Sequence, residues 1–423
     1  MPKDNCVVGI DIGTTKICAA IGEPHRDGGI RIVGVGLAPS KALRRGVVVN
    51  IDEAVESIAT AIERAERVSG HKIVSAYLTI TGGQVASLNN RGVVAIANGD
   101  RAVTPEDVER AVEAARVVNI PTNREIIHAI PRHFIVDGQE GIRNPVGMLG
   151  YRLDVEAHLV TAAVTSIQNL SKCVQRLGVD VDGIVLEPLA SGEAVLTDEE
   201  KEMGVVVADI GGGTTGIAVY VEGSVWHTAV LPVGGNHITN DIAVGLRTPF
   251  ATAEEIKVAY ASALGTQVDE DDEIEISTFG RTHRDRISRT QLCEIVEARL
   301  VEIISLIQAE IGNSGYDGLL PAGVVLTGGG AQLEGMADLA AEYLKIPVRI
   351  GVPWDIEGLV DSISAPAYAA AVGLLLWGTR TSAESLGSAT EPRWARRGRE
   401  SRARSQEVTV YNKVREWFRA FLP

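Results

Sequence analysis

The chain has 423 residues, 45% of them hydrophobic, and this length exceeds what a single compact core usually holds. We therefore expect a folded protein of two or more domains. The formal net charge of −15 argues against bulk nucleic-acid binding. No apolar run reaches the roughly 18 residues that would span a bilayer, so we expect at most peripheral contact with a membrane.

The cysteines lie within apolar or helical patterns and show no paired spacing. No signal peptide with a charged start and an apolar middle opens the chain. We therefore expect a reducing, cytoplasmic setting, and the cysteine spacing does not predict a zinc site. The four cysteines are Cys6, Cys18, Cys173 and Cys293.

The first part of the chain has the pattern of an α/β unit. It opens with a strand, a tight turn and a second strand, and a helix with small and apolar residues at helical spacing precedes the last strand. The strands are expected at 7–12, 17–21, 30–35, 46–49 and 74–80.

Between residues 82 and 160 the pattern changes to short strands and one helix, and we interpret this segment as an inserted lobe. Thr104 is expected to cap the helix and Pro105 to occupy its first turn. The parent unit then resumes with a helix at 165–177, a strand at 183–186 and a helix at 190–196.

The second part repeats the order of the first, which indicates a duplicated α/β unit. It has a hairpin from Val205, a strand at 225–230, a helix near 237–246 and a strand at 323–326. A second insertion holds an acidic run at 269–273, most simply a solvated loop, and a long helix at 290–311. The expected domains are a first core half at 1–81 and 161–198, the lobe at 82–160, a second core half at 203–240 and 318–378, and the second insertion at 241–317.

Each hairpin carries a glycine-threonine turn led by an aspartate, Asp11 in the first and Asp209 in the second. Glycine lets backbone N–H groups approach an anion, threonine hydroxyls add donors, and an aspartate can hold a hydrated divalent cation. One such turn could be an ordinary tight turn, but two that face each other could hold one polyphosphate. The turn residues are Gly13, Thr14, Thr15, Lys16, Gly211, Gly212, Gly213, Thr214 and Thr215.

Three further pieces fall where a bound nucleotide would need them. Gly328, Gly329 and Gly330 follow a strand and are expected to open a helix, so that bare backbone approaches phosphate or adenosine. Glu254 and Lys257 share a face early on a helix, although solvated charges are the ordinary interpretation. Glu187 stands at the carboxyl end of a strand, where ligands of open α/β sheets bind.

The carboxyl-terminal region differs from the body in composition and charge. From Glu391 to Pro423 it carries nine Arg or Lys against four Glu. Residues 379–407 have the composition of a flexible linker, and 408–423 predict an amphipathic helix whose face suits the lipid headgroup boundary. Docking on the protein's own core or on a partner is the alternative. The apolar face contains Val414, Trp417, Phe418, Phe421 and Leu422.

These motifs together resemble those of a known superfamily. The order Asp11-x-Gly-Thr-Thr, Glu187-Pro, Asp209-x-Gly-Gly-Gly-Thr and Gly328-Gly-Gly is similar to that of actin, heat-shock chaperones and sugar kinases. The segments at 233–242, 252–257 and 325–331, and the terminal helix, resemble the FtsA family of bacterial actin-like division proteins. The resemblance covers nearly the whole chain except the linker.

The resemblance implies an α/β, actin-like fold of duplicated ribonuclease-H-like domains, with the lobe at 82–160 in place of actin's corresponding subdomain. It implies ATP with Mg²⁺ between the halves, Asp11 and Asp209 near the metal, and the two turns around the phosphates. Gly235, Glu254, Lys257 and Gly328 to Gly330 would surround the adenosine side, and Glu187 would position water for at most slow hydrolysis.

The resemblance also implies partners and a location. They are the FtsZ carboxyl-terminal peptide, other copies of the chain in a filament or homodimer, later division membrane proteins, and the cytoplasmic face of the membrane at the division site. Arg299, on the helix at 290–311, is a candidate partner for peptide carboxylates, with a solvated helix arginine as an equal alternative.

Other members of the superfamily fit less well. A small-molecule kinase needs a general base on an acceptor hydroxyl and has no evident use for the tail. A chaperone needs a further peptide-binding domain, and the roughly 45 residues after Gly378 are too few. A PilM-type pilus assembly protein shares the lobe and is the nearer alternative.

Overall fold

The computed structural model describes residues 6–25, 29–97, 99–265, 268–269, 271–279, 285–316 and 318–387. The chain divides into two units, residues 1–377 and 378–423, and the fold below is that of the first. The predicted terminal helix at 408–423 lies outside the described residues. Within the part that is described, no helix combines the length and apolar character needed to cross a bilayer.

The first sheet contains six strands in the order β11-β6-β1-β2-β3-β19. The first three strands of the chain form an antiparallel meander, and β6 and β11 continue the sheet parallel to β1. Two helices, α1 (Ile51–Ser69) and α3 (Val164–Gln175), cover one face. The strands are β1 (Val7–Ile12), β2 (Lys16–Pro24), β3 (Ile30–Pro39), β6 (Ser75–Ile80), β11 (Asp180–Leu186) and β19 (Ile356–Gly358).

The second sheet repeats the order and the strand directions of β3-β2-β1-β6-β11. Its first three strands are again an antiparallel meander, followed by two parallel neighbours of the first strand. The duplication predicted from the sequence is therefore confirmed. The strands are β14 (Ser224–Leu231), β13 (Thr215–Val221), β12 (Val205–Ile210), β17 (Val324–Thr327) and β18 (Val348–Ile350).

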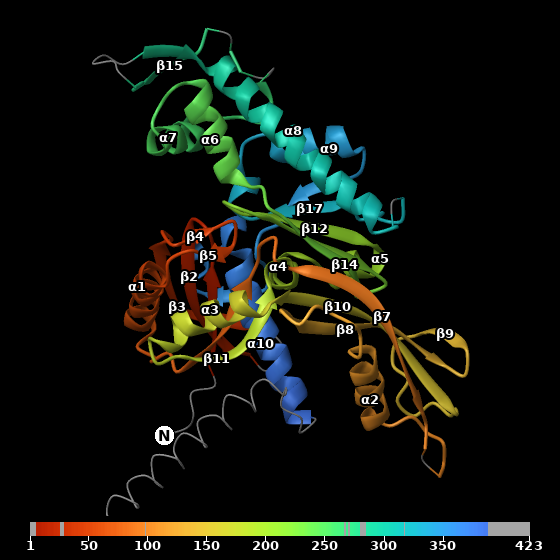
Figure 1. The fold of residues 1–423 in the computed structure, drawn as a ribbon. Coiled ribbons are helices and arrows are strands. Elements are labelled where there is room, and N and C mark those ends of the chain that lie inside the picture. Colours follow the sequence, from red (N-terminus) through yellow and green to blue (C-terminus); the bar gives the residue numbers. More distant parts are fainter. Residues whose placement is uncertain are drawn as a thin grey trace, which may run out of the picture. The chain divides into compact units, whose positions relative to one another are not determined.

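The helices α4 (Glu187–Val195) and α10 (Ala369–Gly387) join the two sheets, and α10 as far as Trp377 belongs to the first unit (Figure 1). Their apolar side chains form one core with residues of both sheets. They cross at Gly373, where an added Cβ would lie 1.7 Å from the Ala190 carbonyl oxygen. Only glycine fits this crossing, so close backbone contact holds the two helices together.

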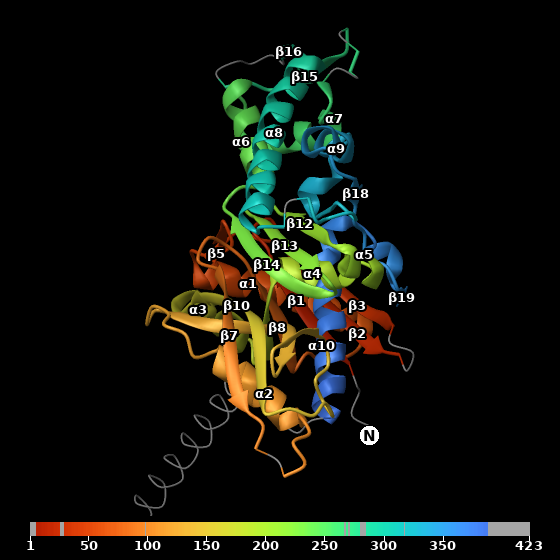
Figure 2. The ribbon, with the colours of Figure 1, turned by 90° about the vertical axis from the view of Figure 1, so that its right-hand side faces the viewer.

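The outer face of the second sheet packs against four helices, and Figure 2 shows α8 and α9 on the side away from α4. The predicted helices near 237–246 and at 290–311 are confirmed. Glu273, expected in an acidic loop, instead begins β15 (Glu273–Ile276), which pairs with β16 (Asp285–Ser288). The helices are α6 (Gly235–Gly245), α7 (Phe250–Tyr260), α8 (Arg289–Asn313) and α9 (Met336–Leu344), and α5 (Asp198–Met203) precedes β12.

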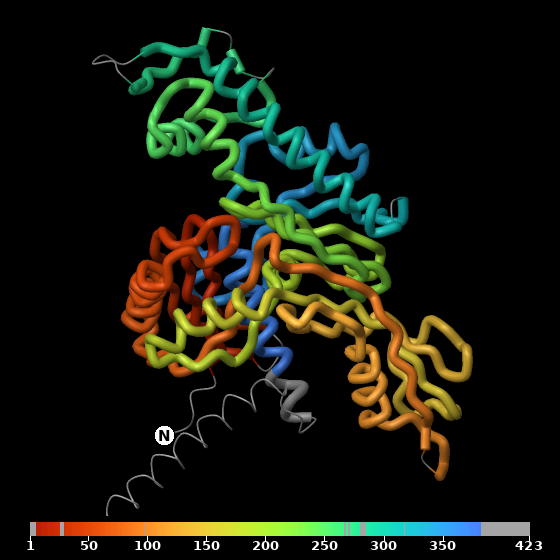
Figure 3. Tube along the Cα trace, in the orientation of Figure 1, coloured from red at the N-terminus to blue at the C-terminus, as the bar shows by residue number. Residues whose placement is uncertain are grey.

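The lobe leaves the first half after β6 and returns to it before α3 (Figure 3). Its helix, α2 (Pro105–Ala115), begins as predicted, and Thr104 and Asp107 form a capping box. The prediction of short strands here was wrong, because the main strands have 10, 13 and 12 residues. The sheet order is β7 (Ala86–Ala95), β10 (Arg152–Ala163), β8 (Arg124–Val136) and β9 (Gln139–Ile142).

Pro131 explains why the sequence pattern does not predict β8 as one continuous strand. Proline cannot donate to a strand ladder and usually marks an edge or an irregularity. In β8 it pairs with Ala157 beside a register shift between Glu156 and Ala157. The irregularity accommodates the missing donor, so the strand continues through the proline.

The lobe contacts the second half through β14, and His158 is buried at this junction. Its Nδ1 lies 2.7 Å from Asn89 Oδ1, and its Nε2 lies 2.9 Å from the Thr228 hydroxyl of β14. The carbonyl oxygen of Asn89 can only accept, so the neutral ring donates from Nδ1 and accepts at Nε2. Burial, followed by the nearby His227 and Arg132, lowers the pKa of His158 to about 3.

We expect the stability of the protein to depend on pH through His158. The unfolded chain protonates this residue near pH 6.5, whereas the folded protein keeps it neutral, so the free energy of unfolding falls as the pH drops below that value. The loss is about 1.4 kcal/mol per pH unit. Urea unfolding at a series of pH values should show that the free energy of unfolding falls less steeply with decreasing pH in His158→Gln than in the parent.

The exposed His25 provides the control, because its side chain is 44% accessible and pairs with Glu357 at the surface. His25→Gln should leave the pH dependence as it is in the parent. If the free energy of unfolding changed equally steeply with pH in the parent and in His158→Gln, the assignment of this pH dependence to His158 would be contradicted.

Candidate functional site

The two hairpin tips occupy equivalent positions in the two sheets. Asp11 pairs with Cys18 across the first hairpin, and Asp209 pairs with Gly216 across the second, each one residue before its strand ends. Gly13 N–H donates to Lys16 O at 3.0 Å, and Gly211 N–H donates to Thr214 O at 2.9 Å. The two turns therefore have the same internal hydrogen bond, as expected of a duplicated element.

The tips face each other and touch. A Cβ added at Gly212 would lie 2.5 Å from Thr15 Cγ2, and one added at Gly213 would lie 2.7 Å from Thr14 Oγ1. Thr81, at the end of β6, also brings its hydroxyl to 3.3 Å from that of Thr214. Glycine is required in the second tip because any side chain there would collide with the first.

A crevice lies between the tips and is lined by residues of both halves. The sequence did not predict Thr81, Ala367 or Ala370, which also line it. The predicted residues that line it are Asp11, Gly13, Thr14, Thr15, Lys16, Glu187, Asp209, Gly211, Gly212, Thr214, Gly328 and Gly329.

Three buried carboxyl groups, those of Asp11, Glu187 and Asp209, lie in this crevice. Burial raises the pKa of Asp11 and raises that of Asp209 to about 6. Burial and the charges of Asp209 and Asp11 raise the pKa of Glu187 well above its usual range. Glu187 Oε2 has no hydrogen-bond partner among the described residues, so one buried acceptor faces the crevice unsatisfied.

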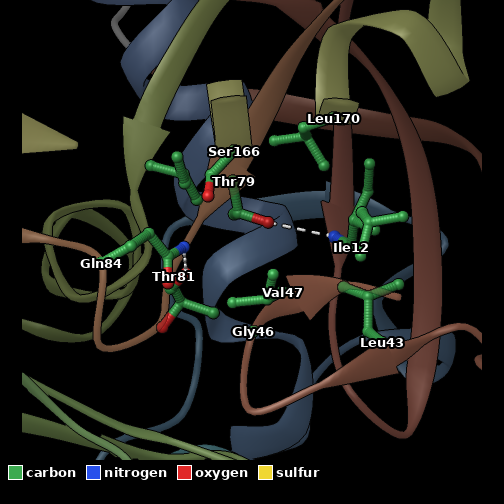
Figure 4. Close-up of a pocket in the computed structure, with 11 residues that line it drawn as sticks. Ile12, Leu43, Gly46, Val47, Thr79, Thr81, Gln84, Ser166 and Leu170 are labelled. Carbon is green, nitrogen blue, oxygen red and sulfur yellow. Dashed lines mark hydrogen bonds between the residues drawn. The ribbon is translucent and has the colours of Figure 1, made fainter. Parts of the chain in front are cut away.

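Neighbouring hydroxyls hold the two aspartates in place. The Thr79 hydroxyl donates to Asp11 Oδ1 at 2.9 Å and accepts from Ile12 N–H at 3.0 Å, and Figure 4 shows the second of these bonds. The Ser191 hydroxyl, on α4, donates to Asp209 Oδ2. The sequence analysis missed both residues. The place of Thr79 at the end of β6, beside β1, was the signal that could have found it.

Figure 4 also shows a small cavity behind the first tip, lined by Ile12, Gly46, Thr81, Gln84 and Leu170 among others. Gln84 Nε2 donates to Thr81 O at 2.5 Å, and Gly46 N–H donates to Thr14 Oγ1 at 3.3 Å. The first bond closes the loop that follows β6, and the second ties the first tip to the turn between β4 (Leu43–Arg44) and β5 (Val47–Val48).

Lys16 is the cation in the lining of the crevice. Its Nζ lies 3.9 Å from Asp11 Oδ2, donates to Ala367 O, and stands 4.8 Å from the ring centre of Tyr368. One ammonium group does not neutralise three carboxylates. The excess of oxygen ligands fits a hard divalent cation such as Mg²⁺. The three carboxyl groups do not all approach within 4.8 Å of one another, which fits an ion that keeps part of its water shell.

The glycines after β17 have two different environments. A Cβ at Gly328 would lie 2.2 Å from Asp209 Oδ1, and one at Gly330 would lie 2.5 Å from Ile210 Cγ2, whereas Gly329 has open space around it. These glycines open a helix, as expected, but it is a four-residue 3-10 helix, η2 (Gly329–Gln332). The α-helix α9 starts at Met336, after Gly335, which is left-handed at φ 76°.

Gly235, Glu254 and Lys257 form one cluster beside the second tip. Gly235 N–H donates to Gly211 O at 2.9 Å, and Lys257 Nζ donates to Glu254 Oε2 at 2.7 Å, to Thr239 Oγ1 at 2.8 Å and to Gly235 O at 3.3 Å. The two charged residues lie in the middle and last part of α7 rather than early on it. The Thr215 hydroxyl donates to Val233 O at 2.9 Å and so holds the loop that leads from β14 to this cluster.

Arg299 lies on α8 and is not part of the crevice. Its guanidinium pairs with Asp241, with 3.0 Å between Nη2 and Oδ1, and with Glu302. The hydrogen bond and charge of Asp241 raise the pKa of Arg299. The side chain is 24% exposed, so it is already engaged within the protein. Val414, Trp417, Phe418, Phe421 and Leu422 lie outside the described residues.

A second histidine, the partly buried His128, reaches the site from the lobe. Leu186 N–H, at the end of β11 and next to Glu187, donates to His128 Nε2 of β8 at 3.0 Å. The His128 ring also meets the ring of Trp377 edge-on, with 5.3 Å between the centres. Burial lowers the pKa of His128 to about 4, so the ring stays neutral and accepts the hydrogen bond.

Comparison with known proteins agrees with this geometry. A family model described as "Cell division protein FtsA" matches residues 206–373, and one described as "SHS2 domain inserted in FTSA" matches residues 82–161. The cell division protein FtsA of Pseudomonas aeruginosa is 47% identical over 380 residues, which cover 90% of this chain and 91% of that protein.

Solved structures establish the class of fold. The PilM-PilN type IV pilus biogenesis complex aligns with a TM-score of 0.64 at 18% identity, covering 88% of this chain and 98% of that one. MreB5 of Spiroplasma citri bound to ADP aligns with a TM-score of 0.54 at 15% identity, covering 91% and 98%. The predicted actin-like fold is confirmed, and the chain belongs to the FtsA family of cell division proteins.

Proposed function

We propose that the chain binds ATP with Mg²⁺ in the crevice between the hairpin tips. The observation that supports this most is the contact of two equivalent glycine-threonine turns above three buried carboxyl groups. A structural neighbour with the same fold is bound to ADP, which supports a nucleotide as the ligand. The proposed role of Gly13, Thr14, Thr15, Lys16 and Gly211 to Thr214 is to surround the phosphates.

The remaining crevice residues take complementary roles in this proposal. Asp11 and Asp209 hold the hydrated Mg²⁺, which neutralises phosphate charge when it is bound. The cluster of Gly235, Glu254 and Lys257 stands on the adenosine side, opposite Gly328 to Gly330. Glu187 orients a water toward the terminal phosphate through its unsatisfied oxygen. Because Glu187 is crowded by like charges, we expect hydrolysis to be slow.

Substitution of the glycines should separate nucleotide binding from folding. Gly212→Asp places a side chain and a negative charge against Thr15, and we expect it to abolish ATP binding in calorimetry. Gly329→Ala adds a methyl group where no protein atom lies within 4 Å, so the fold should be kept. We expect this variant to bind ATP about tenfold more weakly, about 1.4 kcal/mol.

Gly312→Asp is the matched control, because it adds the same charge at an exposed position of α8. Its affinity for ATP should equal that of the parent. Unchanged affinity in both Gly212→Asp and Gly329→Ala would place the nucleotide elsewhere.

Replacement of Glu187 should affect hydrolysis and not binding. Glu187→Gln replaces the carboxyl group with an amide that cannot accept a proton and leaves the shape of the crevice, so we expect ATP affinity to stay within about threefold and turnover to fall by at least about tenfold. The rate of phosphate release under saturating ATP measures the turnover. The exposed Glu199→Gln serves as control. Turnover equal to that of the parent would remove Glu187 from the mechanism.

We further propose that the chain anchors FtsZ filaments to the cytoplasmic face of the membrane at the division site, polymerises there, and recruits later division proteins. Membership of the FtsA family supports a role in the division machinery. The basic, amphipathic sequence at 408–423 supports a peripheral anchor with Val414, Trp417, Phe418, Phe421 and Leu422 in the lipid boundary. A PilM-like role is weaker, because that similarity at 18% identity concerns the fold.

The anchor can be tested with anionic liposomes and FtsZ. The double change Trp417→Glu and Phe418→Glu should leave both proteins unbound in flotation, because it places two charges on the apolar face. On a monolayer of the same lipids, electron microscopy should show filaments of the parent with ATP and none of the variant. Trp354→Glu, which changes an exposed tryptophan of the folded body, should behave as the parent.

Arg299→Glu in the same assay tests the partner site. The variant should still float with the liposomes but should no longer carry FtsZ with it. Because Arg299 pairs with Asp241, Asp241→Asn breaks the same ion pair without reversing the charge of the arginine and should retain FtsZ. Flotation of the Trp417 and Phe418 variant would overturn the anchor, and full recruitment by Arg299→Glu would move the peptide site elsewhere.

A further inference from the structure

A second set of metal-ligating side chains lies at the other end of β1 from Asp11. Cys6 immediately precedes β1, Glu23 is near the end of β2, and His71 follows α1. One ligand atom of each, the sulfur, a carboxylate oxygen and a ring nitrogen, lies within 4.8 Å of the other two. All three residues are partly buried. We propose that Cys6, Glu23 and His71 bind Zn²⁺.

Strand register brings the first two ligands together. Val7 pairs with Gly22 in the antiparallel β1–β2 ladder, and continuing this register by one residue sets Cys6 opposite Glu23. Directly opposed residues of antiparallel strands share a face, with their Cβ atoms about 5 Å apart. Cys6 packs against the core that contains Val8, Ile10 and α1, so this face is the one that α1 covers.

The cap of α1 supplies the third ligand on the same face. The helix ends at Ser69, and Gly70 turns the chain in the left-handed region at φ 74°. The next residue is His71, whose N–H donates to Ser69 Oγ at 3.1 Å. Three separate elements, a strand start, a strand end and a helix cap, thus hold the ligand atoms in position.

The ligand types select the class of ion. A thiolate and an imidazole with one carboxylate suit a borderline-soft cation such as Zn²⁺, whereas Mg²⁺ prefers oxygen ligands only. Tetrahedral zinc places its ligand atoms roughly 3.5 Å apart, so small side-chain rotations close the site. Water completes the fourth position. The site is therefore chemically distinct from the crevice and does not depend on the proposed nucleotide function.

Cobalt provides a direct probe, since Co²⁺ replaces Zn²⁺ and reports a thiolate ligand by its absorbance. Metal-free full-length protein with Mg²⁺ and ATP in excess should bind one Co²⁺ per chain, with a thiolate-to-cobalt band in the near ultraviolet that Zn²⁺ abolishes. Cys6→Ser should lose the band. Glu23→Gln and His71→Gln should weaken Co²⁺ binding by at least about tenfold.

Two controls keep the test independent of folding. Cys293→Ser should keep the band, because this buried cysteine lies in α8 and its hydrogen bond from Ser262 N–H is available to serine. Zinc should raise the unfolding temperature of the parent and of Cys293→Ser by several degrees and leave Cys6→Ser unchanged. A band that persists in Cys6→Ser would place the cobalt on another cysteine, and no band at stoichiometric cobalt would show that these three side chains do not bind the ion; either result would overturn the proposal.

Discussion

The repulsion among three buried carboxyl groups is the constraint around which the centre of this protein is arranged. Asp11, Glu187 and Asp209 come from three different elements. Burial raises the pKa of each, the charge of Asp11 adds to the rise at Asp209, and the charges of both aspartates add to the rise at Glu187. Hydroxyl donors from Thr79 and Ser191 reduce the cost for the two aspartates, but Glu187 keeps one oxygen without a partner. Groups of this kind are retained in a fold when a bound cation relieves the repulsion.

Close backbone contacts maintain this arrangement. The crossing of α4 and α10 at Gly373 fixes the helix that begins with Glu187 and carries Ser191. The Cβ-free positions Gly212 and Gly328 allow the second tip and the turn after β17 to reach Thr15 and Asp209. Because glycine has no side chain, the backbone can approach closely at these points, and the strand ends of both sheets meet at one place.

The parts of the fold that depend on local pattern were predictable from the sequence. The two hairpins, the capped helix at Thr104 and the strand that ends before Glu187 all follow from turn chemistry and periodicity. The strands of the lobe were not predictable in this way. Pro131 and scattered polar residues interrupt the alternation of apolar and polar residues, and a register shift accommodates them in the structure. The helix expected after Gly328 is present only as a four-residue 3-10 helix, and the α-helix α9 begins after the left-handed Gly335.

The site residues that the sequence did not predict reach the crevice through tertiary contacts. Thr79, Thr81 and Ser191 have no motif of their own, and they reach the crevice only because β6 lies beside β1 and α4 crosses beneath β12. The ion pair of Arg299 with Asp241 is also a tertiary contact, between α8 and α6, and the role of Arg299 toward a partner stays a prediction.

The hydrogen bond from Leu186 N–H to His128 connects the lobe mechanically to the crevice. The bond joins a lobe strand to the residue before Glu187, and the same ring rests against Trp377, the last residue of the first unit. A rotation of the lobe would have to break this bond or move the start of α4 with it. A displacement of the lobe would therefore be transmitted by this imidazole to the backbone next to the Glu187 carboxyl group.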